Sequence, residues 1–106
     1  MAWMFLFVAG LLEIVWAFTM KLSQGFTRAT PTAVTLVAML ASFTLLSISM
    51  RTLPLGTAYT VWTGIGAVGA FAVGVVVLGE PLTPGRVLGA ALILAGLTVM
   101  RLSTPS

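Results

Sequence analysis

Residues 3–20 read WMFLFVAGLLEIVWAFTM, an apolar stretch that contains one charged side chain, Glu13. An α-helix needs about 20 mainly apolar residues to cross the roughly 30 Å of hydrocarbon in a bilayer. Because lipid offers the backbone no hydrogen-bond partners, an isolated stretch of this kind can cross the bilayer only as a helix. The stretch therefore predicts a membrane-spanning helix with a carboxyl group near its middle.

Three further apolar stretches follow, at about residues 31–50, 57–78 and 86–101. The short connections between them contain glycine or proline, which end helices. We therefore predict an all-α membrane protein, a single transmembrane domain over residues 1–106. Its four transmembrane helices should cover about residues 3–20, 31–50, 57–78 and 86–101.

The composition agrees with this class and excludes several others. Hydrophobic residues make up 59% of the 106 residues and charged residues 7%, against about a quarter charged in soluble domains. The chain has no cysteine, no histidine and two acids, so we expect neither a disulfide framework nor a metal site. No phosphate-binding glycine loop is present and the basic residues are scattered singly. We therefore expect no ATP use, no cofactor and no nucleic-acid partner.

The charges give no clear orientation in the membrane. With four spans, Arg51 and Arg101 lie on one face, and Lys21, Arg28 and Arg86 lie on the other. That is almost no bias for the positive-inside rule. Two interpretations stay open: a weak bias fixes one topology, or the chain inserts in both orientations.

Small residues repeat on the last two expected helices. The repeats are Gly85, Gly89 and Gly96 on the fourth, and Gly66, Ala70 and Gly74 on the third. Such repeats let helices approach closely in lipid, although glycine is also simply common in membrane helices. Because four thin helices enclose little space, we expect an oligomer, with Gly89 and Gly96 at the interface between its subunits.

Glu13 is the residue that needs a chemical explanation. An ionised side chain near the bilayer centre costs about 2.5–3.5 kcal/mol on insertion scales. Burial disfavours the charged form, so the carboxyl group can hold a proton at neutral pH and release it to an arriving cation. The alternative is a protonated glutamic acid that donates one hydrogen bond to a neighbouring helix. Glu80, between Gly79 and Pro81, is expected to be a solvated loop acid.

Aromatic and hydroxyl side chains accompany Glu13 at membrane depth. The candidates for a small-cation site are Glu13, Trp16, Ser42, Tyr59 and Trp62, with Gly10 and Thr63 lining it. The carboxylate supplies charge, the rings attract cations over their faces, and the hydroxyls orient the acid. For Tyr59 and Trp62 the alternative is an aromatic belt at the membrane surface.

Two glycines, Gly64 and Gly66, lie one residue apart in the third stretch. Such a pair lowers local stiffness and predicts a bend in the helix. In a transporter a bend can accommodate alternating access, whereas in a static protein it would only be a weakness.

At these residues the sequence resembles the small multidrug resistance transporters, over essentially its full length. The matching motifs are EIVWA at 13–17, KLSQGFTR at 21–28, PLGTAY at 54–59 and VWTGIGA at 61–67. Trp16 after the glutamate, and Thr63 where a serine is the alternative, resemble the branch that exports guanidinium. Thr60 departs from the alanine that is more usual in the family.

The resemblance implies a secondary active transporter, not an enzyme: a proton-coupled antiporter that exports guanidinium and small guanidinyl cations across a bacterial inner membrane. It implies an antiparallel, dual-topology homodimer in which both copies of Glu13 share one site. It also implies that Ser42, Tyr59 and Trp62 support the glutamates and that Trp16 lines the site. The alternatives are a quaternary ammonium exporter of the same family, a channel, a proteolipid ring subunit and a non-transporting membrane subunit.

Overall fold

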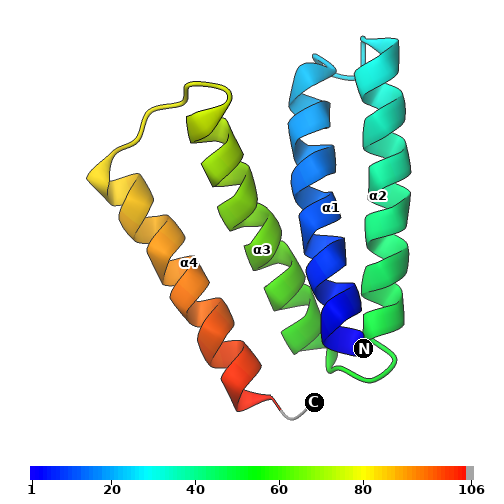
Figure 1. The fold of residues 1–106 in the computed structure, drawn as a ribbon, viewed down its shortest axis with the longest axis vertical. Helices are drawn as coiled ribbons and strands as arrows, with labels where there is room; N and C mark the ends of the chain where they lie inside the picture. Colours follow the sequence, from blue (N-terminus) through cyan, green and yellow to red (C-terminus); the bar gives the residue numbers. More distant parts are fainter. Residues whose placement is uncertain (105–106) are drawn as a thin grey trace.

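The computed structural model describes residues 1–104, and within that range the chain forms four α-helices (Figure 1). They are α1 (Ala2–Leu22), α2 (Ala29–Ser49), α3 (Leu55–Val76) and α4 (Pro84–Ser103). Each has 20 to 22 residues and is apolar enough to cross a membrane. At 1.5 Å per residue they are roughly 30–33 Å long, which matches the hydrocarbon thickness. The prediction of an all-α chain with four helices capable of crossing a membrane is confirmed.

The helix ends differ from the expected ranges by a few residues. Helix α3 begins right after Pro54, and α4 begins at Pro84, two residues earlier than expected. Proline suits the first helical position because its missing N–H needs no partner there. The Thr83 side chain then accepts a hydrogen bond from the backbone N of Arg86 at 3.2 Å, a normal N-terminal cap. The short connection ahead of α4 therefore ends in a cap and a proline.

The helices lie side by side in one layer, in the order α2, α1, α3, α4 (Figure 1). The layer measures 42 × 34 × 16 Å, so it is about one and a half helices thick. The connections α1–α2 and α3–α4 lie at one end, and the α2–α3 connection lies at the other end with Met1 (Figure 1). Helix α1 is thus covered on both sides, whereas α4 is at the edge of the layer.

The core lies between α1, α2 and α3. Its buried hydrophobic residues are Leu6, Ala9, Leu46, Leu53, Ala58, Val61 and Trp62. Two hydroxyl contacts join α1 to α2: the Thr19 and Thr35 hydroxyls are 2.6 Å apart, and Ser42 Oγ donates to Ala9 O at 2.7 Å. No residue of α4 is buried within the described range. The packed part of the chain is therefore the three-helix unit that carries Glu13.

Candidate functional site

Glu13 lies at the contact between α1 and α3, at mid-helix. Its carboxyl group lies directly against Gly66, where an added Cβ would collide with Oε1 and Cδ and would be 2.7 Å from Cγ. The Oε1 atom is buried and has no hydrogen-bond partner within residues 1–104. A glycine at position 66 thus creates the space that the carboxyl group occupies. The structure therefore holds a carboxyl oxygen with unused bonding capacity in the middle of the layer.

Ser42 of α2 joins three helices by hydrogen bonds, and its partner on α1, Ala9, lies one turn before Glu13. Ser42 Oγ donates to Ala9 O on α1 at 2.7 Å and accepts from Trp62 Nε1 on α3 at 3.0 Å. Ser42 is fully buried and Trp62 is 6% exposed. This burial argues against an aromatic belt for Trp62, because a belt residue lies at the membrane surface. In this structure Ser42 fixes the ring of Trp62 and the backbone of the turn that precedes Glu13.

A row of aromatic rings links α1, α2 and α3. The ring centroids of Trp16 and Phe43 are 6.2 Å apart, those of Phe43 and Trp62 5.8 Å, and those of Tyr59 and Trp62 5.4 Å. These are edge-on or tilted contacts, within the 4.5–7 Å range that aromatic pairs prefer. The row brings together three of the predicted site residues, from α1 and α3.

Phe43 is the member of this row that the sequence did not single out. It stands next to Ser42 on α2 and is 44% exposed. A phenylalanine in an apolar membrane helix carries no sequence signal of its own, because most of its neighbours are equally hydrophobic. Its position beside Ser42 was the one available clue. Whether Phe43 or another neighbour of Ser42 faces Trp16 depends on how α2 is rotated about its axis, and the sequence does not give that rotation.

The other predicted residues lie where α3 faces α4 and where α3 contacts α1. Tyr59 is 53% exposed, and with Thr63 and Gly96 it lines a cavity of about 430 Å³ between these helices. Gly64 lies against the Leu97 side chain of α4, and Gly10 lies against Ile65 of α3. Gly64 and Gly66 are thus points of close contact between helices.

The two glycines predicted at a dimer interface have free space around them. A Cβ added at Gly89 or Gly96 meets no heavy atom of residues 1–104 within 4 Å, apart from its own chain neighbours and helix backbone. Their face of α4 is therefore open in the single chain.

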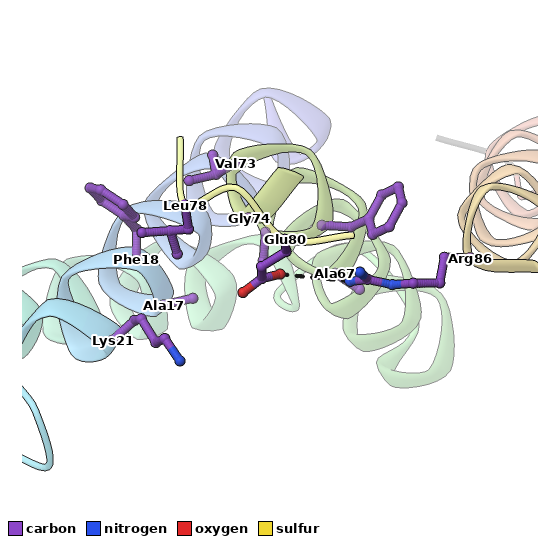
Figure 2. A pocket seen from close by; sticks show the side chains of 11 residues that line it. Ala17, Phe18, Lys21, Ala67, Val73, Gly74, Leu78, Glu80 and Arg86 are labelled. Atoms are coloured by element: carbon purple, nitrogen blue, oxygen red, sulfur yellow. Dashed lines mark ion pairs between the residues drawn. The ribbon is translucent and has the colours of Figure 1, made fainter. Parts of the chain in front are cut away.

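The second acid, Glu80, lies in the loop before α4, as expected from the sequence, and its side chain is 39% exposed. It is partly buried, its carboxyl group lies against Gly74 of α3, and its Oε1 is 3.6 Å from Arg86 Nη2. Figure 2 shows both side chains at a cavity that Lys21 of α1 also lines. The sequence places Glu80 only in a loop; the fold of that loop over the end of α3 turns the side chain inward.

The Glu13 region, with a carboxyl group, aromatic faces and hydroxyls at mid-membrane, has the chemistry of a small-cation site. A family model described as Small Multidrug Resistance protein matches residues 1–93 of the chain. The chain belongs to the small multidrug resistance family.

Curated members of the small multidrug resistance family match the chain along nearly its whole length. The chain is 55% identical over 104 residues to proteins named Guanidinium exporter from Citrobacter freundii and Salmonella typhimurium. These alignments cover 98% of the chain and 99% of each relative. A Guanidinium exporter from Yersinia pseudotuberculosis serotype I is 54% identical over 98% of the chain and 100% of its own length. The resemblance read from the four sequence motifs is therefore confirmed.

Proposed function

We propose that this chain exports guanidinium and small guanidinyl cations in exchange for protons, across the inner membrane of a bacterial cell. The observation that carries the proposal is the mid-membrane carboxyl group of Glu13, lodged on Gly66 with one oxygen free of hydrogen-bond partners within residues 1–104. Full-length relatives at 54–55% identity that are named Guanidinium exporter support the same cargo.

Guanidinium suits this site chemically. The ion is planar and always charged, and its paired N–H groups match the two oxygens of a carboxylate. Glu13 then binds the cation, while Trp16 lines the site and offers a ring face to it. Ser42 and Trp62, joined by a 3.0 Å hydrogen bond, hold the neighbouring turn in place. Tyr59 completes the set, with Gly10 and Thr63 lining it and with Gly64 and Gly66 as the bend of α3.

Proton coupling follows when one carboxyl group binds either partner but not both. A proton on Glu13 removes the negative charge that holds guanidinium, so loading one releases the other. In a dimer the two copies of Glu13 titrate as a coupled pair, so the observed proton affinity belongs to the pair. If the dimer changes its access from one side to the other only when loaded, the proton gradient drives export.

A second copy of the chain in the opposite orientation completes the transporter in this proposal. The single chain is a layer 16 Å thick, and α4 has no buried residue within the described range. The open face at Gly89 and Gly96 suits close packing against another α4. The near balance of basic residues at the two ends favours insertion in both orientations. A tag on the C-terminus should then be found on both sides of the membrane; a single location would contradict this arrangement.

The deciding experiment measures uptake of guanidinium by liposomes that contain the purified chain, with and without a proton gradient. We expect uptake that depends on the gradient and a matching movement of protons. A bulky quaternary ammonium ion tested in parallel separates the two cargo classes of the family. Uptake of quaternary ammonium alone would assign the chain to multidrug export. Guanidinium flux without proton movement would make it a channel, and the absence of flux would make it a non-transporting subunit.

A further inference from the structure

A cavity of about 350 Å³ lies at the end of the molecule where α1 and α3 finish and α4 begins (Figure 2). Its charged lining residues among those described are Lys21, Glu80 and Arg86. Two of these three are cations, so Glu80 is the lining group that can attract a positively charged solute. The site around Glu13 makes no use of it.

Glu80 holds Arg86 loosely. Arg86 Nη2 is 3.6 Å from Glu80 Oε1, beyond the roughly 2.7–2.9 Å of a charge-assisted hydrogen bond. Arg86 Nη1 donates instead to Pro81 O, and the Arg86 guanidinium carbon is 5.1 Å from the centroid of the Phe71 ring. The carboxylate therefore faces a guanidinium group without the paired, bidentate contact that these two groups can form.

The electrostatics of the helix end do not explain why Arg86 lies where it does. The residue lies in the first turn of α4, which contains no acidic side chain. The N-terminal end of a helix carries a partial positive charge and disfavours cations. Glu80 offsets this cost, since its backbone N–H donates to Gly74 O at 3.0 Å and its carboxyl group points back over Gly74. The loop thus presents a carboxylate to a guanidinium group at the rim of the cavity.

The cavity extends from Glu80 toward Glu13. The carboxyl groups of these two acids rest on Gly74 and Gly66 of α3, which are two helical turns, or about 12 Å, apart. Ala70, between the two glycines, lines the cavity together with Ala17, one turn from Glu13 on α1. Small side chains therefore leave space between the loop acid and the level of the central acid.

We infer that Glu80 is a second binding residue for the exported cation, at which free guanidinium replaces the guanidinium group of Arg86 on its way to or from Glu13. The inference rests on the proposed function, because cargo and the Arg86 head group are then the same chemical group. A free guanidinium ion can adopt the bidentate geometry on Glu80 that tethered Arg86 does not reach. Arg86 keeps the carboxylate neutralised while no cargo is present.

The test measures KM and maximal rate of proton-driven guanidinium uptake by liposomes that contain the full chain. Glu80→Gln should raise KM by roughly two- to fivefold, the change expected from loss of one partly exposed charge contact. The maximal rate should stay unchanged, because the contact contributes to binding and not to the transport step. Arg86→Gln should lower KM, since it removes the competing guanidinium group. Glu80→Asp keeps the charge and should restore a KM near that of the wild type.

Arg28→Gln is the matched control for charge. It removes one positive charge from the same end of the molecule, but Arg28 does not line the cavity, so KM should not change. If the pair were merely structural, Glu80→Gln and Arg86→Gln would both lower the thermal unfolding temperature and would leave KM unchanged or shift it in the same direction. That result would overturn the inference while the wild type still exports guanidinium. A wild type without guanidinium uptake would instead contradict the proposed function, and the inference with it.

Discussion

Glu13 and Glu80 are the two acids of the chain, and both rest on a glycine of α3, Gly66 for one and Gly74 for the other. Around them the surroundings differ. Glu13 lies at mid-helix and its Oε1 has no partner within residues 1–104, whereas Glu80 lies in a loop and faces Arg86. The same side chain on the same kind of surface is thus placed once in hydrocarbon and once near water.

This difference determines what each carboxyl group can do. A bare charge at the bilayer centre costs about 2.5–3.5 kcal/mol or more, so under the proposed function Glu13 holds either a proton or a cation at nearly all times. A partly exposed ion pair is screened by water and contributes about 0–1 kcal/mol, so Glu80 can release its partner easily. The central acid is suited to obligatory exchange, and the loop acid to transient binding.

Glu13→Gln should separate the two acids most strongly. We expect proton-driven guanidinium uptake to fall by roughly 30-fold or more, since loss of a buried charge partner costs about 2–5 kcal/mol. Initial rates of uptake into liposomes measure the effect, and cross-linking in the same samples checks that the proposed dimer still forms. Glu80→Gln should retain its maximal rate. Wild-type uptake by the Glu13→Gln variant would remove Glu13 from the mechanism.

The two glycines offer a matched pair of substitutions, Gly66→Ala and Gly74→Ala. Both substitutions gain the same helix propensity, about 1 kcal/mol. A difference in stability or uptake between the two variants therefore reflects how tightly each carboxyl group is packed against its glycine. At Gly66 the new methyl collides with Glu13 along its length, which overpacks the α1–α3 contact and costs about 1–3 kcal/mol. At Gly74 the Glu80 side chain can swing outward to water.

We therefore expect Gly66→Ala to reduce uptake about tenfold, the rate equivalent of 1.4 kcal/mol, and Gly74→Ala to have a much smaller effect. Uptake rates and thermal unfolding temperatures of both variants provide the comparison. Equal losses in the two variants would mean that Glu13 is no more tightly constrained than Glu80.

The pH dependence of cargo binding should belong to Glu13 and not to Glu80. A proton on Glu13 abolishes the charge that holds guanidinium, so KM should rise as the pH falls. The expected slope is about tenfold per pH unit for each proton displaced, at pH values where the site is protonated. Uptake at several pH values measures it, and the slope should persist in Glu80→Gln. A KM that does not change with pH would exclude competition between proton and cation.

The contrast between the two acids also shows how much of the fold and of the candidate site could be predicted from the sequence. The length of the apolar stretches predicted four membrane helices, because a helix must be long enough to cross the hydrocarbon. The carboxylate within the first stretch singled out Glu13, because a charge in hydrocarbon is costly. The contact of the Glu80 carboxyl group with Gly74 could not be predicted, since it depends on how a short loop folds over the end of α3. Phe43 was missed because the rotation of α2, which aims the ring at Trp16 and Trp62, depends on packing between helices. The roles of the individual site residues stay predictions until variants are measured.

Ser42→Ala should have a smaller effect than Glu13→Gln or Gly66→Ala, and it acts on the Glu13 region alone. The substitution leaves Trp62 Nε1 buried without its acceptor and removes the bond to Ala9 O. Hydrogen bonds between membrane helices contribute about 0.6–1.7 kcal/mol, so we expect a loss of stability of that size and a decrease in uptake of only a few-fold. Thermal unfolding followed by tryptophan fluorescence measures the first effect.

Ser47→Ala is the control for this change, because Ser47 is an exposed serine of the same helix. It should unfold at the wild-type temperature, while Ser42→Ala unfolds at a lower one. Equal unfolding temperatures would show that the bonds of Ser42 do not stabilise the turn before Glu13. The position of the central carboxyl group would then depend on Gly66 and on the packing of α1 against α3, and the aromatic row would have to keep Trp62 in place without a hydrogen bond.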